Sequence, residues 1–241
     1  MSLKIALLGY GKMGRLLDRL ATEAGHTVVL RVGQQQRPNL TAEQLDRADV
    51  AIDFSHPDTG YENAKFCLES GVALVSGTTG WLDRFGEIEV LCAEREGAFF
   101  YASNFSVGVN LFFALNRYLA RQMNEFPAYH PTLSETHHTA KVDAPSGTAL
   151  TLAEGILAEM DRLSGWTKGS TDVLDQLSVL SHRIDPTPGT HEIRYDSEED
   201  TLRIEHVAHG RVGFARGALR AAAWLVGRKG VFGMGDLLRT S

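Results

Sequence analysis

Short apolar runs alternate with amphipathic stretches over the first hundred residues of the chain. The apolar runs are rich in Val, Ile, Leu and Phe, which is typical of buried strands, and the stretches between them have helical spacing. Strands that alternate with helices predict right-handed βαβ units and a parallel sheet. The predicted strands cover residues 4–8, 27–32, 50–54, 73–76 and 98–101, and the predicted helices cover residues 13–24, 58–69 and 82–96.

This rhythm changes after about residue 105. A long helix, an extended segment and a second helix are followed by three runs that we interpret as an antiparallel block, and then by a last helix. The pattern therefore predicts an α/β chain: a Rossmann-type doubly wound parallel sheet with a second α+β domain built on a mostly antiparallel sheet. The later elements are expected at residues 109–123, 132–138, 148–162, 176–184, 190–196, 201–207 and 212–226.

Charge and cysteine content exclude several classes of protein. The formal net charge of −6 argues against nucleic acid or an acidic membrane as a partner, so an anionic ligand needs a local basic pocket. Cys67 and Cys92 form no CxxC pair, which argues against a zinc cluster or a disulfide framework. Neither a signal-peptide layout nor an apolar run of roughly 20 residues is present, so we expect a cytoplasmic protein.

The sequence Gly9-Tyr-Gly11-Lys-Met-Gly14 matches GxGxxG directly after a predicted strand and before a predicted helix. This context favours a dinucleotide site over a glycine turn without a ligand, because the helix N-terminus can bind a pyrophosphate. We expect residues 1–106, completed by 212–241, to form the dinucleotide-binding domain, and residues 107–211 to form a substrate-binding and oligomerisation domain. The expected cofactor contacts here are Gly9, Gly11, Lys12, Met13 and Gly14.

The end of the second predicted strand lacks the acid that often binds the adenosine ribose. Arg31 and Arg37, with Gln34 to Gln36 between them, suit a ribose 2′-phosphate instead. We therefore expect NADPH, or NADPH and NADH alike, as the cofactor, with Arg31 as a contact. A solvated charge at the strand end is an equally good interpretation of Arg31.

Two polar loops follow the fourth and fifth predicted strands, at the sheet edge where ligands bind in open α/β sheets. Each loop is a weak signal alone, but both lie at the same edge as the glycine turn. The cofactor contacts expected in these loops are Gly77, Thr78, Thr79, Ser103, Asn104 and Phe105.

The segment from Glu135 to Thr148 concentrates groups that can bind an anion and supply a proton. His137 and Lys141 lie four residues apart and share a face in a strand or in a helix, so we expect both to be catalytic. Lys141 also offers a point charge to a carboxylate. Asp143 either orients Lys141 or is a solvated loop acid.

Ser146-Gly147-Thr148 opens a predicted helix and resembles an anion cradle of hydroxyls and backbone N–H groups. Helix capping by these residues and contact with a ligand are compatible. We expect His138, Ser146, Gly147 and Thr148 to bind the substrate. Several histidines could in principle bind a metal, but no third partner supports His206-x-x-His209, so we expect no metal site.

At these positions the chain resembles the dihydrodipicolinate reductase (4-hydroxy-tetrahydrodipicolinate reductase) family. The resemblance implies an NADH- or NADPH-dependent enzyme of lysine and diaminopimelate biosynthesis that acts on a small dicarboxylate, usually as a homotetramer. It implies acid–base work for His137 and substrate binding by His138, Lys141, Gly147 and Thr148. The motifs that carry it are the glycine turn, Asp53-Phe-Ser, Gly77-Thr-Thr-Gly, 103–110, 137–149, 214–225 and 230–234.

Two other interpretations stay open. Another two-domain oxidoreductase, such as an aspartate- or homoserine-type dehydrogenase, would show a different substrate requirement for NADPH oxidation. A nucleotide-sensing protein of the same fold would bind NAD(P) without turnover, although a sensor does not need the proton donor that His137 offers.

Overall fold

The computed structural model describes residues 2–239, apart from the side chain of Pro38, and divides the chain into two compact units. The first unit runs to Val107 and resumes at Arg211, and the second comprises Gly108–Gly210. These limits differ by one residue from the expected domain limits at 106/107 and 211/212. Residues 1, 240 and 241, which the expected first domain includes, lie outside the described residues.

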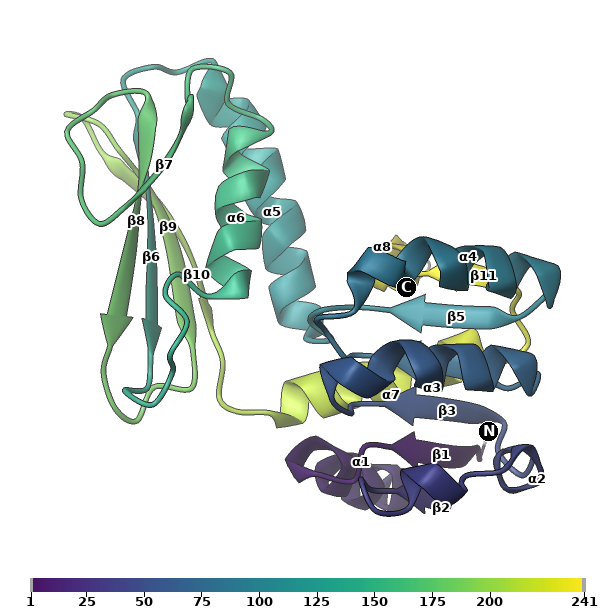
Figure 1. The fold of residues 1–241 in the computed structure, drawn as a ribbon. Coiled ribbons are helices and arrows are strands. Elements are labelled where there is room, and N and C mark those ends of the chain that lie inside the picture. The colour runs from purple at the N-terminus through teal and green to yellow at the C-terminus, as the bar shows by residue number, and fades with distance from the viewer. Residues whose placement is uncertain (1, 240–241) are drawn as a thin grey trace. The chain divides into compact units, whose positions relative to one another are not determined.

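The first unit contains a six-stranded sheet in which all pairings are parallel (Figure 1). The strand order β11-β5-β4-β3-β1-β2 places β2 and β3 on opposite sides of β1. Open sheets bind ligands at such a reversal of strand order, outside the carboxyl ends of the strands. The strands are β1 (Lys4–Leu8), β2 (Thr27–Val32), β3 (Val50–Asp53), β4 (Ala73–Ser76), β5 (Ala98–Tyr101) and β11 (Gly230–Phe232).

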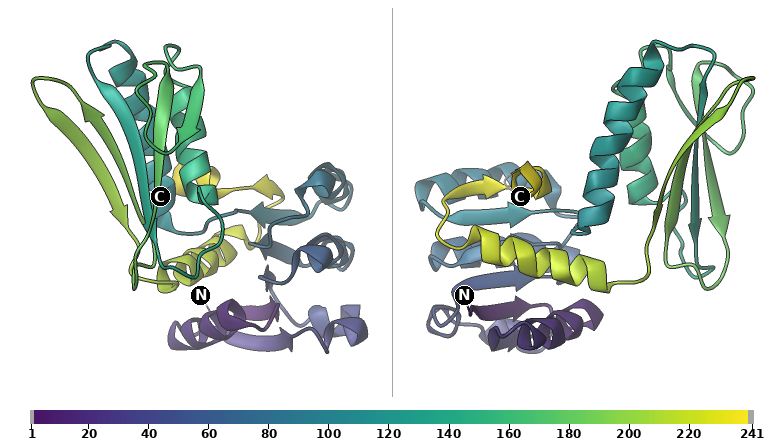
Figure 2. Two further views of the ribbon diagram at one scale, coloured as in Figure 1. Left: turned by 60° about the vertical axis from the view of Figure 1, so that its left-hand side comes forward. Right: turned by 180° about the vertical axis from the view of Figure 1, so that it is seen from behind.

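Helices cover both faces of this sheet (Figure 2). In β1, Ile5 and Leu7 belong to one apolar cluster and Ala6 and Leu8 to the other, because successive side chains point to opposite faces. Helices α1, α7 and α8 contribute to the first cluster, and α2, α3 and α4 to the second. The helices are α1 (Lys12–Glu23), α2 (Ala42–Leu45), α3 (Pro57–Glu69), α4 (Phe85–Glu94), α7 (Val212–Leu225) and α8 (Met234–Arg239), with 3₁₀ turns η1 (Arg37–Asn39) and η2 (Leu82–Arg84).

The second unit packs α5 and α6 side by side on one face of a five-stranded sheet (Figures 1 and 2). The order is β10-β9-β6-β8-β7. The β6–β9 and β9–β10 pairs are antiparallel, whereas the β6–β8 and β8–β7 pairs are parallel. The elements are α5 (Val107–Asn124), β6 (His130–His137), α6 (Gly147–Leu157), β7 (Gly165–Lys168), β8 (Gln176–Arg183), β9 (Thr190–Asp196) and β10 (Thr201–Val207).

The sequence pattern predicts a mostly antiparallel sheet here, but the sheet in the structure is mixed. The crossover through α6 leads into β7, and β7 and β8 both run in the direction of β6. The short elements α2, β7, β11 and α8 were not expected either. None of the helices within residues 2–239 combines the length and the apolar character needed to cross a lipid bilayer.

Candidate functional site

The face of the second sheet that α6 covers changes from apolar to polar along β6. The buried Leu133 belongs to the apolar core of this unit. Two residues further, Glu135 lies opposite His191 on β9, and after two more His137 lies beside Arg183 on β8. Because side chains alternate along a strand, these polar residues continue the same face as Leu133. The sheet register therefore collects charged and imidazole groups at one end of the core.

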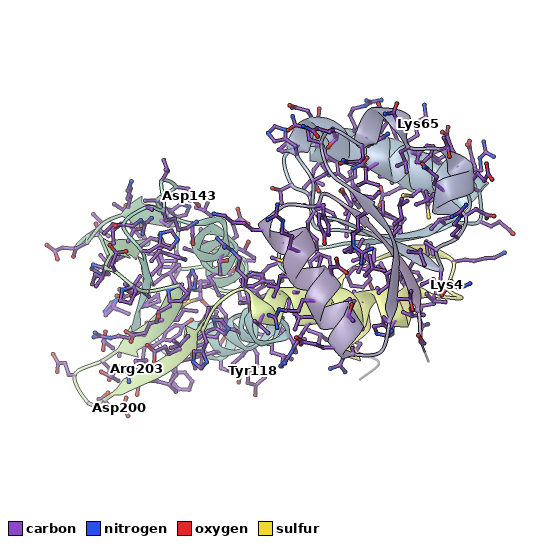
Figure 3. The ribbon with its side chains drawn as sticks, turned by 90° about the horizontal axis from the view of Figure 1, so that it is seen from below. Lys4, Lys65, Tyr118, Asp143, Asp200 and Arg203 are labelled. Atoms are coloured by element: carbon purple, nitrogen blue, oxygen red, sulfur yellow. The ribbon has the colours of Figure 1, made fainter. Side chains whose placement is uncertain are left out.

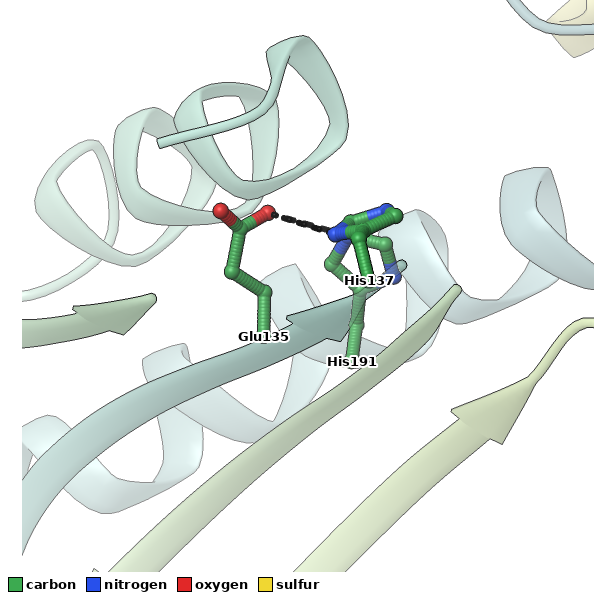
Figure 4. Close-up of side chains that lie close together, drawn as sticks. All are labelled: Glu135, His137 and His191. Carbon is green, nitrogen blue, oxygen red and sulfur yellow. Dashed lines mark ion pairs between the residues drawn. The ribbon is translucent and has the colours of Figure 1, made fainter. Parts of the chain in front are cut away.

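Glu135 is the centre of this group and is completely buried. Its carboxylate accepts the backbone N–H of Ser146 at 3.1 Å from each oxygen, and Arg183 donates to Oε1 at 3.4 Å. The other oxygen, Oε2, lies 3.5 Å from His137 Nδ1 and 3.7 Å from His191 Nε2 (Figure 4). We call these five residues the Glu135 cluster.

The Glu135 carboxylate is ionised at neutral pH. Burial alone would raise the pKa of Glu135, but the contacts with His191 and Ser146 outweigh burial and hold the pKa well below its ordinary value. A buried negative charge therefore faces the Arg183 guanidinium and the two imidazole rings.

His137 is buried and neutral in the free protein, with only 7% of the residue exposed. Burial lowers the pKa of His137 to about 4, and the neighbouring His191, Lys141 and Arg183 add to the lowering, whereas Glu135 opposes it. Its Nε2 faces Gly189, where an added Cβ would lie 3.1 Å from that nitrogen. Only a residue without a side chain leaves that space beside the ring free.

Lys141 is held by an ion pair within its own loop. Its Nζ lies 2.7 and 2.8 Å from the two oxygens of Asp143, and its backbone N–H donates to the His138 carbonyl at 3.1 Å. The hydrogen bond from Lys141 lowers the pKa of Asp143, a residue at the surface of the second unit (Figure 3). Asp143 therefore pairs with Lys141 and is at the same time an exposed loop acid. Arg183 donates to the carbonyls of Lys141 and Asp143, which ties this loop to Glu135.

Ser146 caps α6, as the sequence predicts. Its Oγ accepts the Ala149 N–H at 3.2 Å and lies 3.3 Å from His191 Nε2. Gly147 is exposed and Thr148 is half-buried in the first turn of the helix, which contains no acidic residue. Backbone N–H groups at such a helix start suit an anion. Contact of Ser146, Gly147, Thr148 and the half-buried His138 with a substrate stays a prediction.

A cavity of about 620 Å³ lies at the carboxyl ends of β1, β2 and β3 in the first unit. Gly9 has φ +92°, and a Cβ there would lie 2.1 Å from the Phe54 carbonyl oxygen, so no other residue fits. A Cβ on Gly11, in contrast, would meet nothing within 4 Å, so the turn is open to a ligand at this point. The lining residues are Leu8, Gly9, Tyr10, Gly11, Val32, Gly33, Gln34, Arg37, Phe54, Ser55, His56, Asp58, Thr59 and Asn63.

The start of α1 at this cavity suits a phosphate group. The helix begins at Lys12, no side chain caps it, and its first turn has no acidic residue. No capping side chain accepts a hydrogen bond from its first N–H groups, and these groups lie at the positive end of the helix dipole. A pyrophosphate beside Gly11 would supply the missing acceptors.

The two basic residues at and after the end of β2 have different surroundings. Arg31 donates to both oxygens of Asp18, at 2.7 and 2.8 Å, and Tyr10 donates to the same carboxylate. Arg31 does not line the cavity, whereas Arg37 does and donates through Nε to Asn63 Oδ1. The geometry thus favours Arg37 over Arg31 as the basic residue that faces a ligand.

A buried acid fixes the wall of the cavity. Asp53, completely buried at the end of β3, accepts hydrogen bonds from Thr78 Oγ1 at 2.7 Å, Asn63 Nδ2 at 2.9 Å and Ser76 Oγ at 3.3 Å. Burial raises the pKa of Asp53 despite these donors. Thr78 also accepts the Ser55 N–H at 2.9 Å and is only 4% exposed. Its hydroxyl therefore positions the cavity wall.

The other expected cofactor contacts are not among the residues that line the cavity. Phe105 is buried between Phe54 and Phe100, with ring centroids 5.6 and 5.9 Å away, and Gly77 donates to the Asp53 carbonyl. The other members of this set lie at element ends as expected, and their contact with a cofactor stays a prediction. They are Lys12, Met13 and Gly14 in α1, Thr79 after β4, and Ser103 and Asn104 after β5.

Three residues of the Glu135 cluster were not among the expected site residues. Glu135 could have been found, because period 2 places it on the face of His137. His191 and Arg183 could not, because their proximity depends on the pairing of β9 and β8 with β6. Among the residues at the cavity, Ser55 and Asn63 were missed because their contacts with Thr78 and Asp53 join separate elements of the chain.

The fold and the two sites define a two-domain oxidoreductase that binds a pyridine nucleotide. Residues 3–105 match the family described as "Dihydrodipicolinate reductase, N-terminus", and residues 108–238 match "Dihydrodipicolinate reductase, C-terminus". The chain therefore belongs to the dihydrodipicolinate reductase family, as the sequence motifs led us to expect.

Individual relatives agree with this assignment. The chain is 40% identical over 237 residues to the 4-hydroxy-tetrahydrodipicolinate reductase of Christiangramia forsetii, covering 98% of each chain. It is 34% identical to the enzyme of the same name from Neisseria gonorrhoeae, covering 98% of this chain and 97% of that one.

Solved structures show the same fold. Dipicolinate-bound dihydrodipicolinate reductase from Paenisporosarcina sp. TG-14 superimposes with a TM-score of 0.79 at 22% identity, covering 98% of this chain and 99% of that one. An amine dehydrogenase from Mycobacterium smegmatis gives a TM-score of 0.60 at 8% identity, over 96% and 94% of the two chains. At these identities the likeness concerns the fold alone.

Proposed function

We propose that the protein catalyses the NAD(P)H-dependent reduction of dihydrodipicolinate, which 4-hydroxy-tetrahydrodipicolinate forms by loss of water, to tetrahydrodipicolinate in lysine and diaminopimelate biosynthesis. The observation that carries this proposal is the similarity to named reductases over 98% of the chain. The segment that carries His137 and Lys141 is intact within it and lies at the polar end of the second sheet.

The cavity at the glycine turn supports binding of the pyridine nucleotide in the first unit. The open backbone at Gly11 and the uncapped start of α1 suit the pyrophosphate. Arg37, together with the absence of an acid after β2, supports NADPH as the preferred cofactor or equal use of both. When bound, the nicotinamide supplies the hydride for the reaction.

The loop between β6 and α6 supports binding of a dicarboxylate. Lys141 offers its ammonium group, and Gly147 and Thr148 offer N–H groups at the start of α6. In the free protein the Lys141 ammonium group donates to both oxygens of Asp143. A substrate carboxylate therefore has to share the ammonium group with Asp143 or displace Asp143 from it. Fixing the carboxylate in this way orients the ring carbons that react.

His137 is the proposed proton donor. Burial keeps it neutral in the free protein, and the negative charges of a bound dicarboxylate raise its pKa, so it takes up a proton as the substrate binds. The hydride adds to one ring carbon, and the displaced electron pair takes the proton at the neighbouring carbon. Glu135 beside Nδ1 positions the imidazole for this transfer.

A coupled assay with freshly generated substrate tests this function. Oxidation of NADH and of NADPH is followed separately, and we expect turnover with NADPH or with both. His137→Gln should lower kcat roughly 10²-fold or more without changing cofactor affinity. Lys141→Ala should mainly raise KM for the substrate. Near-wild-type turnover of His137→Gln would remove that residue from the chemistry.

The same assay separates the two other functions. A nucleotide sensor would bind NADPH tightly but would not oxidise it, whichever cyclic imine is added. A dehydrogenase of the aspartate or homoserine type would oxidise NADPH only with its own substrate. We also propose a homotetramer in the cytoplasm, which rests on the family resemblance. Light scattering during size-exclusion chromatography tests the first and cell fractionation the second.

A further inference from the structure

The Glu135 cluster presents three ligand atoms in a geometry that suits a transition-metal ion. Ligand atoms of Glu135, His137 and His191 all lie within 4.8 Å of one another, and all three residues are buried (Figure 4). Glu135 Oε2 lies 3.5 Å from His137 Nδ1 and 3.7 Å from His191 Nε2. Nitrogen and oxygen ligands at about 2.0–2.1 Å from a tetrahedral Zn²⁺ are about 3.3 Å apart. Small side-chain shifts thus close the site around an ion.

His137 Nδ1 has no hydrogen-bond partner among the described residues, although it is buried. A metal ion would satisfy this nitrogen.

Arg183 leaves Oε2 of Glu135, the oxygen nearest the two imidazoles, available to an ion. Arg183 donates to Oε1 only, whereas both imidazoles approach Oε2. The Ser146 N–H fixes the carboxylate in place, which is the part that groups outside the ligand set play in metal sites. The positive charge of Arg183 opposes the ion and weakens its binding without blocking the ligand atoms.

We propose that Glu135 Oε2, His137 Nδ1 and His191 Nε2 bind one Zn²⁺ or Co²⁺ ion per chain. Three protein ligands leave a fourth position open to water. The bound ion prevents protonation of the His137 ring at Nδ1 and so inhibits proton transfer, a consequence that rests on the proposed function. The sequence predicted no metal site, because the three ligands meet only through the β6–β9 pairing.

Direct binding of Co²⁺ tests the site. Chelator-treated protein is dialysed against CoCl₂, and bound cobalt is counted and its visible absorption recorded. We expect one ion per chain, displaced by ZnCl₂. His137→Gln and His191→Gln should each weaken binding by more than the roughly 10- to 100-fold typical of changes outside the ligand set. The matched control is His182→Gln, an exposed histidine on β8, which should bind as the wild type does.

The two readouts separate this inference from the proposed function. Circular dichroism and NADPH binding show that each variant is folded. Wild-type protein that binds no Co²⁺, or folded His191→Gln that binds it as tightly as the wild type, overturns the metal site. Co²⁺ binding by a protein whose chelator-treated, metal-free form shows no reductase activity leaves the site standing and refutes the function. Cobalt is counted without substrate, because a ring nitrogen flanked by two carboxylates is itself a chelator.

Discussion

Replacing Glu135 by Gln removes one buried charge and almost nothing else. The amide oxygen can still accept the Ser146 N–H, but the Arg183 guanidinium loses its anionic partner at 3.4 Å. Breaking a fully buried ion pair costs about 3–5 kcal/mol. Arg183 keeps 21% of its side chain exposed and still donates to three backbone carbonyls, so its charge is not left alone. We therefore expect a loss of about 2–3 kcal/mol in the free energy of unfolding.

Urea unfolding at pH 7.5, followed by circular dichroism, measures this loss for the second unit. The pH dependence gives a second check. Because the folded-state pKa of Glu135 lies below its ordinary value, its contribution is present above the unfolded pKa, near 4.5, and is lost as the pH falls through the folded value. The difference between wild type and variant should therefore shrink in acid.

The matched control is Glu192→Gln, one residue after His191. Glu192 pairs with Arg203 at 3.3 Å, but the Arg203 side chain is 59% exposed, so we expect a change below about 1 kcal/mol. Equal stability of Glu135→Gln and wild type at pH 7.5 would refute the reasoning. A difference that grows on acidification would refute it as well.

Three further outcomes are expected. The pKa of His137 is about 4, against 6.5 for the ordinary side chain, so protonation of the unfolded state should lower the free energy of unfolding by about 3 kcal/mol as the pH falls from 6.5 to 4. Urea unfolding of His137→Gln should show a smaller loss over that range, and an unchanged slope would contradict this expectation. Arg37→Ala should weaken NADPH binding by about tenfold or more while NADH binding hardly changes, as measured by fluorescence titration; if Arg31→Ala does so instead, the phosphate contact belongs to Arg31. Gly9→Ala should lower the free energy of unfolding by about 2 kcal/mol or more in thermal unfolding, because the new Cβ would lie 2.1 Å from a backbone oxygen. Gly11→Ala should leave this stability unchanged and weaken only cofactor binding. Equal losses of stability in the two variants would argue against the turn geometry.

The parallel sheet could be predicted because its strands are local signals. Each of its first five strands is a short apolar run between polar turns, and each expected range agrees with the structure to within one residue. The mixed sheet could not be predicted in the same way. Strand β7 (Gly165–Lys168) has no alternation and is half-buried for most of its length, and β11 has three residues, so neither produces a periodic pattern.

The site shows the same division between local and long-range information. His137, Lys141 and Ser146 lie in one segment, so their residue types and spacing indicate an acid and an anion site. The role of Arg37 depends on the ion pair that holds Arg31 against Asp18, a contact between β2 and α1 that no spacing encodes. His191 enters the site from a strand more than fifty residues away from His137, through backbone pairing alone.

Both oxygens of Asp143 accept hydrogen bonds from Lys141, so Asp143 competes with any incoming anion for the Lys141 ammonium group. A ligand with a single weak negative charge has to match a tethered carboxylate whose local concentration is very high, so common buffer anions should gain little from this ammonium group. A ligand with two acidic arms gains at a second place, the start of α6, and can offset that competition. We therefore expect selectivity for doubly charged molecules to depend on Asp143, a side chain that need not touch them.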